Sequence, residues 1–315
     1  MVQSVDGVLL LDKAVGMSSN AALQRAKRLL NAAKAGHTGT LDPLASGLLP
    51  LCFGEATKFA QFLLDAEKTY LADVQLGRST TTGDSEGEVI FESDATSVRR
   101  EDIDRVLRSL IGESEQTPPM YSALKHKGRP LYAYARAGQT VQRASRRIVV
   151  HRLDLLSAQT GQINLRLHVS KGTYIRALAQ EIGERLGCGA HLASLRREAT
   201  GGFTLEQAVT LEQLEQMHAE ARLAGLLPVD RLAASLPPLQ LSEPAMQAIV
   251  EGRVVPARIE AGLVRLYGPT EDFLGIGEVT VSQCLRPKRL LNTGPTSRLA
   301  RWSLRNSLAQ LEEKG

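Results

Sequence analysis

One short segment of the sequence carries the residue types from which a catalytic site could be built. Residues 36–50 read GHTGTLDPLASGLLP and contain a single carboxylate, Asp42, followed by Pro43. Because proline disfavours a helical conformation in the residue before it, we expect Asp42 to be extended. The leucines on either side would pack against a core and make the loop rigid. Such a loop could hold one acid ready for catalysis, although an ordinary Asp-Pro turn would contain the same residues.

Basic residues are concentrated in particular parts of the chain. The formal net charge is only +4, yet residues 121–155 hold eight lysines and arginines and one acid, whereas residues 65–104 hold eleven acids and four bases. Three tyrosines lie within the basic segment, Tyr121, Tyr132 and Tyr134. Clustered positive charge suits phosphates, and tyrosine rings stack on unpaired bases. RNA is the partner that this pattern favours, and a merely solvated basic surface is the alternative.

Several classes of protein are disfavoured by the composition. No apolar run reaches the length of a membrane span. The three cysteines, Cys52, Cys188 and Cys284, form no CxxC motif, and the histidines show no metal-ligand spacing. The sequence contains no P-loop and no dinucleotide-binding fingerprint. We therefore expect a cytoplasmic protein that uses no metal and no cofactor.

Hydrophobic periodicity predicts a mixed α/β fold. Alternating residues indicate strands, and apolar residues at helical spacing indicate helices. The expected strands are 7–13, 68–76, 161–170 and 192–197, and the expected helices include 98–111, a helix ending at Leu186 before Gly187, and one near 211–224. From residue 239 to about 291 the pattern changes to short strands separated by glycine turns. A large mixed domain followed by a small all-β unit is the predicted organisation.

Residues 36–50 resemble the TLDP motif of the TruB family, the pseudouridine synthases that modify the T loop of tRNA. Other motifs of that family are similar to segments of this chain in the same order, namely KTY at 68–70, SKGTYIRALA at 170–179 and GAHLASLRR at 189–197. The family's first motif usually reads KPxGxxS, whereas this chain has Lys13-Ala14 in place of the lysine and proline. These segments cover most of the large domain.

The resemblance assigns roles to individual residues. It implies that Asp42 is the catalytic residue and that Arg176 pairs with it as a charged partner. It implies that Tyr70 stacks on the target base and that Tyr174 and Leu195 line the uracil pocket. Taken alone, Arg176 would be interpreted as a surface residue on the first turn of a helix, and Tyr70 as a core residue.

His37 has two interpretations. The resemblance implies that it fills the space left by a flipped base or contacts a neighbouring nucleotide. A structural histidine that satisfies its own hydrogen bonds is the alternative.

The family also implies a fold and a function. The fold is a mixed α/β (α+β) pseudouridine synthase domain at 1–235 with a central mixed, largely antiparallel sheet, then a PUA-like RNA-binding barrel at 239–291 and a tail at 292–315. The activity is isomerisation of uridine 55 in the T loop of tRNA, with the T-arm stem-loop as partner and the enzyme a monomer. The alternatives are an RNA chaperone that folds tRNA by binding it, and a synthase of the same fold that acts on another RNA.

Overall fold

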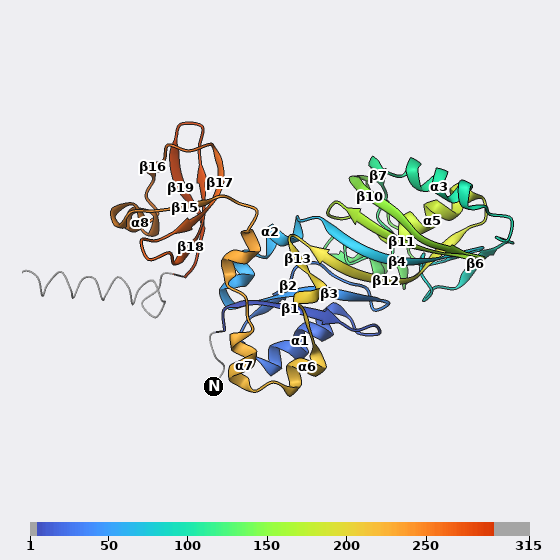
Figure 1. Ribbon diagram of the computed structural model, residues 1–315, viewed down its shortest axis with the longest axis horizontal. Coiled ribbons are helices and arrows are strands. Elements are labelled where there is room, and N and C mark those ends of the chain that lie inside the picture. The colour runs from blue at the N-terminus through green and yellow to red at the C-terminus, as the bar shows by residue number, and fades with distance from the viewer. Residues whose placement is uncertain (1–4, 293–315) are drawn as a thin grey trace, which may run out of the picture.

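The computed structural model describes residues 5–292, and the predicted 292–315 tail lies almost wholly outside this range. Figure 1 shows a long twisted sheet with helices at both of its ends and a separate small β unit formed by the last part of the described chain. In the described residues no helix is long and apolar enough to cross a membrane.

The central sheet is mixed and largely antiparallel, which confirms the predicted fold class. Its order is β14-β1-β3-β12-β4-β11-β10-β7, and only β1 with β14 and β3 with β12 are parallel neighbours. The strands are β1 (Gly7–Lys13), β2 (Ala35–His37), β3 (Ala45–Phe53), β4 (Lys68–Leu76), β7 (Gly112–Gln116), β10 (Arg146–Gln159), β11 (Gln162–Val169), β12 (Ala190–Thr200), β13 (Phe203–Thr204) and β14 (Val209–Thr210). The short strands β2 and β13 pair with β3 and β12.

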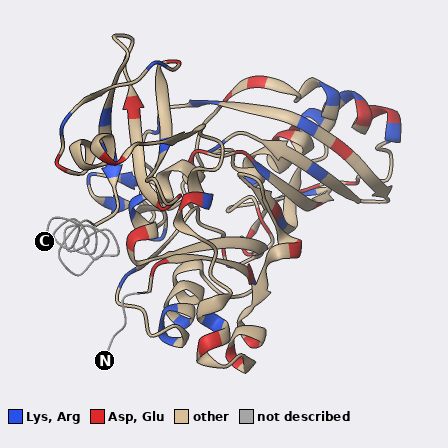
Figure 2. Ribbon diagram, turned by 60° about the vertical axis from the view of Figure 1, so that its left-hand side comes forward, with Lys and Arg blue, Asp and Glu red and all other residues tan. Residues whose placement is uncertain are grey.

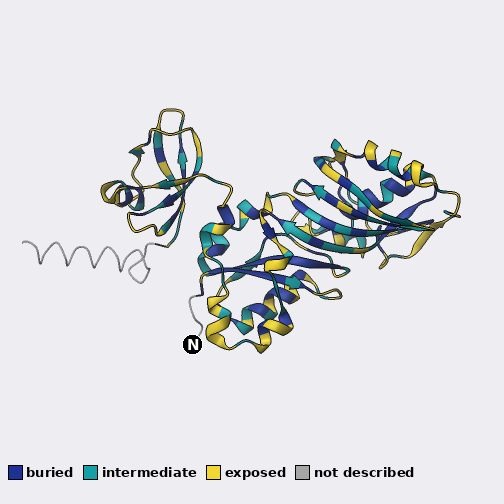
Figure 3. Cartoon of the chain, viewed as in Figure 1, coloured by how far each residue is buried: buried dark blue, intermediate teal, exposed yellow. Residues whose placement is uncertain are grey.

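One hydrophobic core extends along the sheet, from β1 and β3 to β10 and β11. On β4 the buried residues alternate with half-buried ones, so that one face of the strand packs inward. The same core takes in apolar residues of the helices α1 (Ser19–Leu29), α3 (Arg100–Ser109) and α5 (Ile175–Leu186). Figure 3 shows that each of these helices presents a buried and an exposed side. The sheet is therefore a continuous platform that connects distant helices.

Further short elements lie around the sheet. The hairpin strands are β5 (Arg78–Thr80) with β6 (Val89–Glu92), and β8 (Lys125–His126) with β9 (Arg129–Pro130). The short helices are η1 (Gly54–Lys58), α2 (Ala60–Leu64), α4 (Leu131–Ala135), η2 (Leu205–Gln207), α6 (Leu211–Gln216), α7 (Ala219–Ala224) and η3 (Val229–Ala233). Residues 117–145, which we call the insert, leave the sheet after β7 and return at β10. They include residues 121–145, the first part of the basic segment, with all three of its tyrosines.

The predicted helix near 211–224 is two helices instead of one. Met217, at the end of α6, has an extended backbone with φ −70° and ψ 146°. The Arg222 guanidinium donates hydrogen bonds to the carbonyls of Leu214 and Glu215, which satisfies the exposed C-terminal end of α6. Because a side chain replaces the missing helical donors, the break in the helix is stabilised.

The C-terminal β unit has the all-β character predicted for this part of the chain. Its five strands are β15 (Pro238–Gln240), β16 (Val255–Pro256), β17 (Gly262–Tyr267), β18 (Phe273–Val279) and β19 (Cys284–Leu290), accompanied by α8 (Glu243–Val250). It packs on the large unit through the edge-on rings of Phe59 and Phe273, 5.5 Å apart. Tyr267 Oη also donates a hydrogen bond of 2.8 Å to Asp230. The two units therefore share an apolar and polar interface.

Gly47 marks a very close approach of two parallel strands. It lies on β3 opposite Arg197 of β12, and its φ is +99°. A Cβ atom at this position would lie 2.3 Å from the Arg197 carbonyl oxygen. Neither the conformation nor the space allows a side chain, so the close pairing of β3 with β12 requires glycine.

We expect Gly47→Ala to lower the free energy of unfolding by more than about 3 kcal/mol, because the strand must move as well as adopt a strained φ. Gly16→Ala is the matched control. Gly16 has φ +82°, and an added Cβ would have no atom within 4 Å. Its loss should be about 1–2 kcal/mol, from backbone strain alone. Urea unfolding of the three proteins measures both values, and equal losses would contradict the close-approach argument.

Candidate active site

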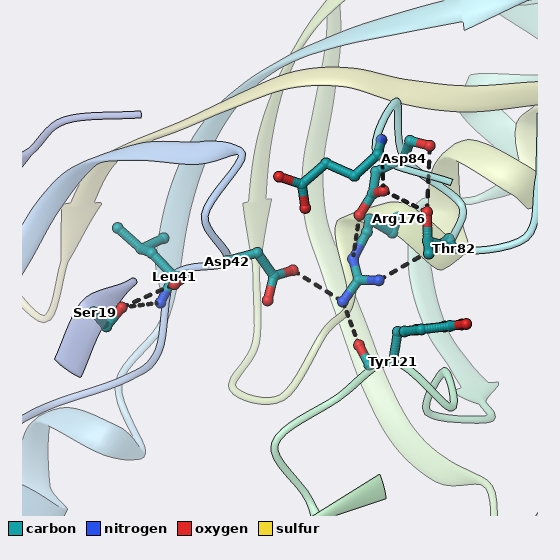
Figure 4. Close-up of polar contacts among 8 residues, drawn as sticks. Ser19, Leu41, Asp42, Thr82, Asp84, Tyr121 and Arg176 are labelled. Carbon is teal, nitrogen blue, oxygen red and sulfur yellow. Dashed lines mark hydrogen bonds and ion pairs between the residues drawn. The ribbon is translucent and has the colours of Figure 1, made fainter. Parts of the chain in front are cut away.

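The loop before β3 holds Asp42 by fixing the residue in front of it. Ser18 caps α1 by accepting a hydrogen bond from the Ala21 N–H, which leaves Ser19 free to face the loop. The Ser19 hydroxyl accepts a 2.8 Å hydrogen bond from the Leu41 N–H and donates a 2.9 Å bond to the Leu41 carbonyl. Leu41 is itself buried. The carboxylate of Asp42 therefore projects from a backbone that is fixed by both apolar packing and hydrogen bonds (Figure 4).

Arg176 is buried at the start of α5 and faces Asp42. Its Nη2 lies 2.9 Å from Asp42 Oδ2 and its Nε lies 3.4 Å from Asp84 Oδ2. The remaining donors bond to the carbonyls of Thr82 at 3.0 Å and Tyr121 at 2.6 Å. The Arg176 side chain is 5% exposed and that of Asp42 is 41% exposed. The pair thus joins a buried cation to an acid that a ligand can reach.

Asp84 is a site residue that the sequence analysis did not identify. Its side chain is 4% exposed, and Asp84 Oδ1 accepts hydrogen bonds from the Thr82 hydroxyl at 2.5 Å and the Glu86 N–H at 3.1 Å. Burying one ionised group without a counter-charge is costly. Asp84 and Asp42 together surround the single Arg176 guanidinium, so the cluster has one positive and two negative charges.

Two further buried cations lie close to the Asp42 loop, and the sequence analysis predicted a role in the site for neither. Arg197 is buried and donates hydrogen bonds to the carbonyls of Leu48 at 2.6 Å and Gly39 at 3.2 Å. Lys13 is also buried, and its amine donates to the carbonyls of Ala14 and Met17. Burial lowers the pKa of Lys13 to about 8, and the negative charge of Asp42 partly opposes that shift. The loop that carries Asp42 therefore rests on positive charge.

The strand register places Tyr70 and Leu195 near one another on one face of the sheet. Leu195 of β12 pairs with Ala45, three residues after Asp42, and with Ala72 of β4. Tyr70, two residues before Ala72, is buried and pairs with Arg197. Because side chains two residues apart share a face of a strand, Tyr70 and Leu195 project from the same side of the sheet.

Tyr174 and His37 are the two remaining residues that the sequence analysis assigned to the site. Tyr174 caps α5 two residues before Arg176, and its ring faces the Arg146 guanidinium at 4.8 Å. His37, on β2, is half-buried, and its Nδ1 is buried without a hydrogen-bond partner among the described residues. Burial, followed by the nearby positive charge of Arg197, lowers the pKa of His37. The imidazole is therefore neutral at neutral pH.

Comparison with solved structures places the fold. The chain is similar to a crystal structure described as a Cbf5-Nop10-Gar1 complex, with a TM-score of 0.69, 30% identity and coverage of 88% of this chain and 79% of that one. It is also similar to the structure of an H/ACA RNP bound to a substrate RNA containing 2′-deoxyuridine, with a TM-score of 0.69, 25% identity and coverage of 93% and 87%. The fold is that of the pseudouridine synthases, and the C-terminal β unit is PUA-like.

Sequence comparison defines the family. Residues 27–175 match the N-terminal domain of TruB family pseudouridylate synthases, residues 176–234 match a tRNA pseudouridylate synthase B C-terminal domain, and residues 237–291 match the C-terminal part of pseudouridine synthase II TruB. A tRNA pseudouridine synthase B of Thiobacillus denitrificans is 54% identical over 292 residues, 92% of this chain and 97% of that protein. One of Pseudomonas aeruginosa is 50% identical over 297 residues, with coverage of 92% and 97%. The chain belongs to the TruB family of pseudouridylate synthases, which are isomerases.

The buried charge cluster makes Arg176 important for stability. Arg176→Met leaves the Asp84 carboxylate buried without its counter-ion, and we expect a loss of about 3–5 kcal/mol in the free energy of unfolding. Adding Asp84→Asn removes the unpaired charge and should restore part of that loss. Arg166→Met breaks the exposed pair with Glu198 and should cost less than about 1 kcal/mol. Urea unfolding tests this order, which fails if the double variant is no more stable than Arg176→Met.

Lys13 predicts a pH dependence of stability. Since its folded pKa of about 8 lies below the ordinary lysine pKa of 10.5, the unfolded chain binds more protons between these values. The destabilisation is therefore complete below pH 8 and disappears as pH rises through 10.5. Between pH 7.5 and 9.5 we expect wild type to gain about 2 kcal/mol relative to Lys13→Met, at 1.36 kcal/mol per pKa unit.

Urea unfolding of both proteins at the two pH values measures this gain. Other titrating groups cancel in the comparison, and the hydrogen bonds lost in the variant add only a constant difference. A stability difference that does not change with pH would contradict the lowered pKa of Lys13.

Proposed function

We propose that this synthase isomerises uridine 55 in the T loop of tRNA and that Asp42 is its catalytic residue. The observation that carries the proposal is the half-exposed Asp42 carboxylate, held 2.9 Å from a buried guanidinium. The Arg176 guanidinium fixes the direction of the Asp42 carboxylate through a charge-assisted pair. The names of the relatives, tRNA pseudouridine synthase B, support tRNA as the substrate.

The chemistry requires a nucleophile or an anionic stabiliser but no second acid. Glycoside cleavage generally uses one carboxyl group to protonate the leaving group. Uracil leaves as a resonance-stabilised anion, so one carboxylate is sufficient. Asp42 acts either by attacking the sugar carbon or by stabilising an oxocarbenium-like state while a ribose proton is removed. The base then turns and is rejoined through C5, and Tyr70 is the candidate for removing the C5 proton.

The target uridine must leave its stack to reach Asp42. This costs a few kcal/mol, and stacking on the ring of Tyr70 would return roughly 1–3 kcal/mol. Tyr174 and Leu195 would line the uracil pocket. We assign His37 to the space that the flipped base vacates, because a neutral imidazole with a free ring nitrogen can stack on bases and accept or donate a hydrogen bond.

The insert and the C-terminal β unit supply the surface for RNA. In the insert, the guanidinium groups of Arg129 and Arg136 lie over the rings of Tyr134 and Tyr132, at 4.9 and 5.5 Å. Such pairs combine phosphate-binding charge with flat stacking surfaces. Basic residues are present in both units of the chain (Figure 2). The solved relative bound to a substrate RNA supports the same class of ligand.

The proposal includes a division of the chain. Residues 1–235 would carry out the chemistry, residues 239–291 would bind RNA as a PUA-like domain, and the monomer would act in the cytoplasm on the T-arm stem-loop.

The test is release of tritium from C5 of uridine 55 in a T-arm stem-loop. Wild type should release it, and Asp42→Asn should be slower by at least about 1,000-fold because the reacting group is lost. The RNA Kd should change less than about threefold. Asp65→Asn, which breaks the surface pair with Lys171, is the control and should retain both properties. A second stem-loop, with cytidine in place of uridine 55, measures how much tritium is released from uridines at other positions.

Two outcomes would contradict the proposal. An equal loss of binding and turnover in Asp42→Asn would make Asp42 a binding residue. Salt-sensitive binding by wild type with no release from either the stem-loop or full-length tRNA would favour an RNA chaperone or a different RNA target.

A further inference from the structure

The two ends of the insert meet at a single residue pair. β7 ends at Gln116 and β10 begins at Arg146, and these two residues face each other in the antiparallel ladder. The insert therefore leaves the sheet and returns to it at the same point. Arg143 closes this base further by donating a 2.8 Å hydrogen bond to the Pro118 carbonyl.

Both members of this pair hold Tyr174. The Gln116 amide oxygen accepts a 2.7 Å hydrogen bond from the Tyr174 N–H, and its amide nitrogen donates a 3.1 Å bond to the Tyr174 carbonyl. Gln116 is buried, at 7% exposure, and both bonds are partly buried. From the other side the Arg146 guanidinium lies over the Tyr174 ring at 4.8 Å. One residue thus fixes the backbone of Tyr174, and the other supports its ring.

Arg146 also shapes the turn that precedes Tyr174. Its Nη2 donates a hydrogen bond to the Gly172 carbonyl. Gly172 has φ +77°, and a Cβ there would lie 3.1 Å from the Arg146 Cζ, so a side chain at residue 172 would be strained and would crowd the guanidinium. Arg146 Nε is buried without a hydrogen-bond partner among the described residues. The guanidinium therefore contacts the Tyr174 ring and the Gly172 carbonyl while one of its donors is left without a partner among the described residues.

The same region is joined to the charge cluster. Tyr174 precedes α5 directly, and Arg176 follows two residues later. A third contact comes from within the insert, because Arg176 donates to the carbonyl of Tyr121. Gln116 and Arg146, at the two ends of the insert, therefore contact Tyr174. Tyr121, within the insert, contacts Arg176.

We propose that Gln116 and Arg146 are positioning residues that align Tyr174 and Arg176 with Asp42, and that they couple the placement of the insert on RNA to the rate of isomerisation. This inference rests on the proposed function, since it takes Asp42 as the catalytic residue and Tyr174 as part of the uracil pocket. A shift of the insert moves the Gln116–Arg146 pair and with it the Tyr174 backbone. RNA that seats the insert correctly therefore also completes the site.

Gln116→Leu and Arg146→Met test the inference, because each removes the polar contacts while keeping much of the side-chain volume. The matched control is Arg147→Met. Arg147 is the next residue of β10 and carries the same charge, but it is exposed and pairs with Glu113 instead of contacting Tyr174. Single-turnover rates at saturating T-arm RNA, RNA Kd values and melting temperatures are measured for all the variants.

We expect Gln116→Leu and Arg146→Met to lower the single-turnover rate constant at least tenfold. Their Kd values should stay within about threefold of that of Arg147→Met, whose own rate should remain at the wild-type level. The rate constant of the double variant Gln116→Leu/Arg146→Met should lie within about twofold of that of the slower single variant, because both residues act through Tyr174. Arg146→Lys retains a donor for the Gly172 carbonyl and should recover part of the rate.

Three results would overturn the inference. Wild-type rates with raised Kd values would make Gln116 and Arg146 simple RNA ligands. If the rate constants of the variants equal that of wild type at temperatures where each variant is fully folded, Gln116 and Arg146 contribute only to stability. Multiplicative losses in the double variant would mean that they act independently. If wild type itself fails to react with the stem-loop while binding it, the proposed function fails, and this outcome is distinct from any difference among the variants.

Discussion

The arrangement of the site depends on one buried cation held between two carboxylates. The Arg176 guanidinium is almost fully enclosed and contacts both Asp42 and Asp84. A charge at this depth is tolerated only because its donors are directed at acids and carbonyls from separate parts of the chain. The Asp42 loop, the polar turn at Thr82 and Asp84, and the insert at Tyr121 all meet at this group. Their relative positions are therefore fixed by one electrostatic requirement.

The sequence predicted those features that depend on local pattern. Strands β1 and β4 have the predicted bounds, and Gly187 ends α5 in a left-handed conformation as expected. The change from a mixed domain to an all-β unit was also visible in the spacing of glycines. These properties follow from side-chain periodicity and from glycine's backbone freedom.

Contacts between distant segments could not be predicted in this way. Nothing near Asp84 in the sequence indicates that it lies beside Arg176, 92 positions later, and nothing near Lys13 indicates complete burial. The break between α6 and α7 likewise depends on Arg222 reaching back to the carbonyls of α6. In each case the partner is set by the tertiary fold and not by the neighbouring residues in the sequence.

The interface between the two units has a consequence for the binding of a long ligand. Phe59 packs on Phe273, and Tyr267 bonds to Asp230, so that the PUA-like unit is held on the large unit by both ring packing and a hydrogen bond. In the proposed function each unit contacts the same RNA. Two attachment points at a fixed separation give the second contact a high effective concentration once the first has formed. The protein would therefore bind RNA at two sites held at a fixed distance, and it would favour RNA whose length and bend match that distance.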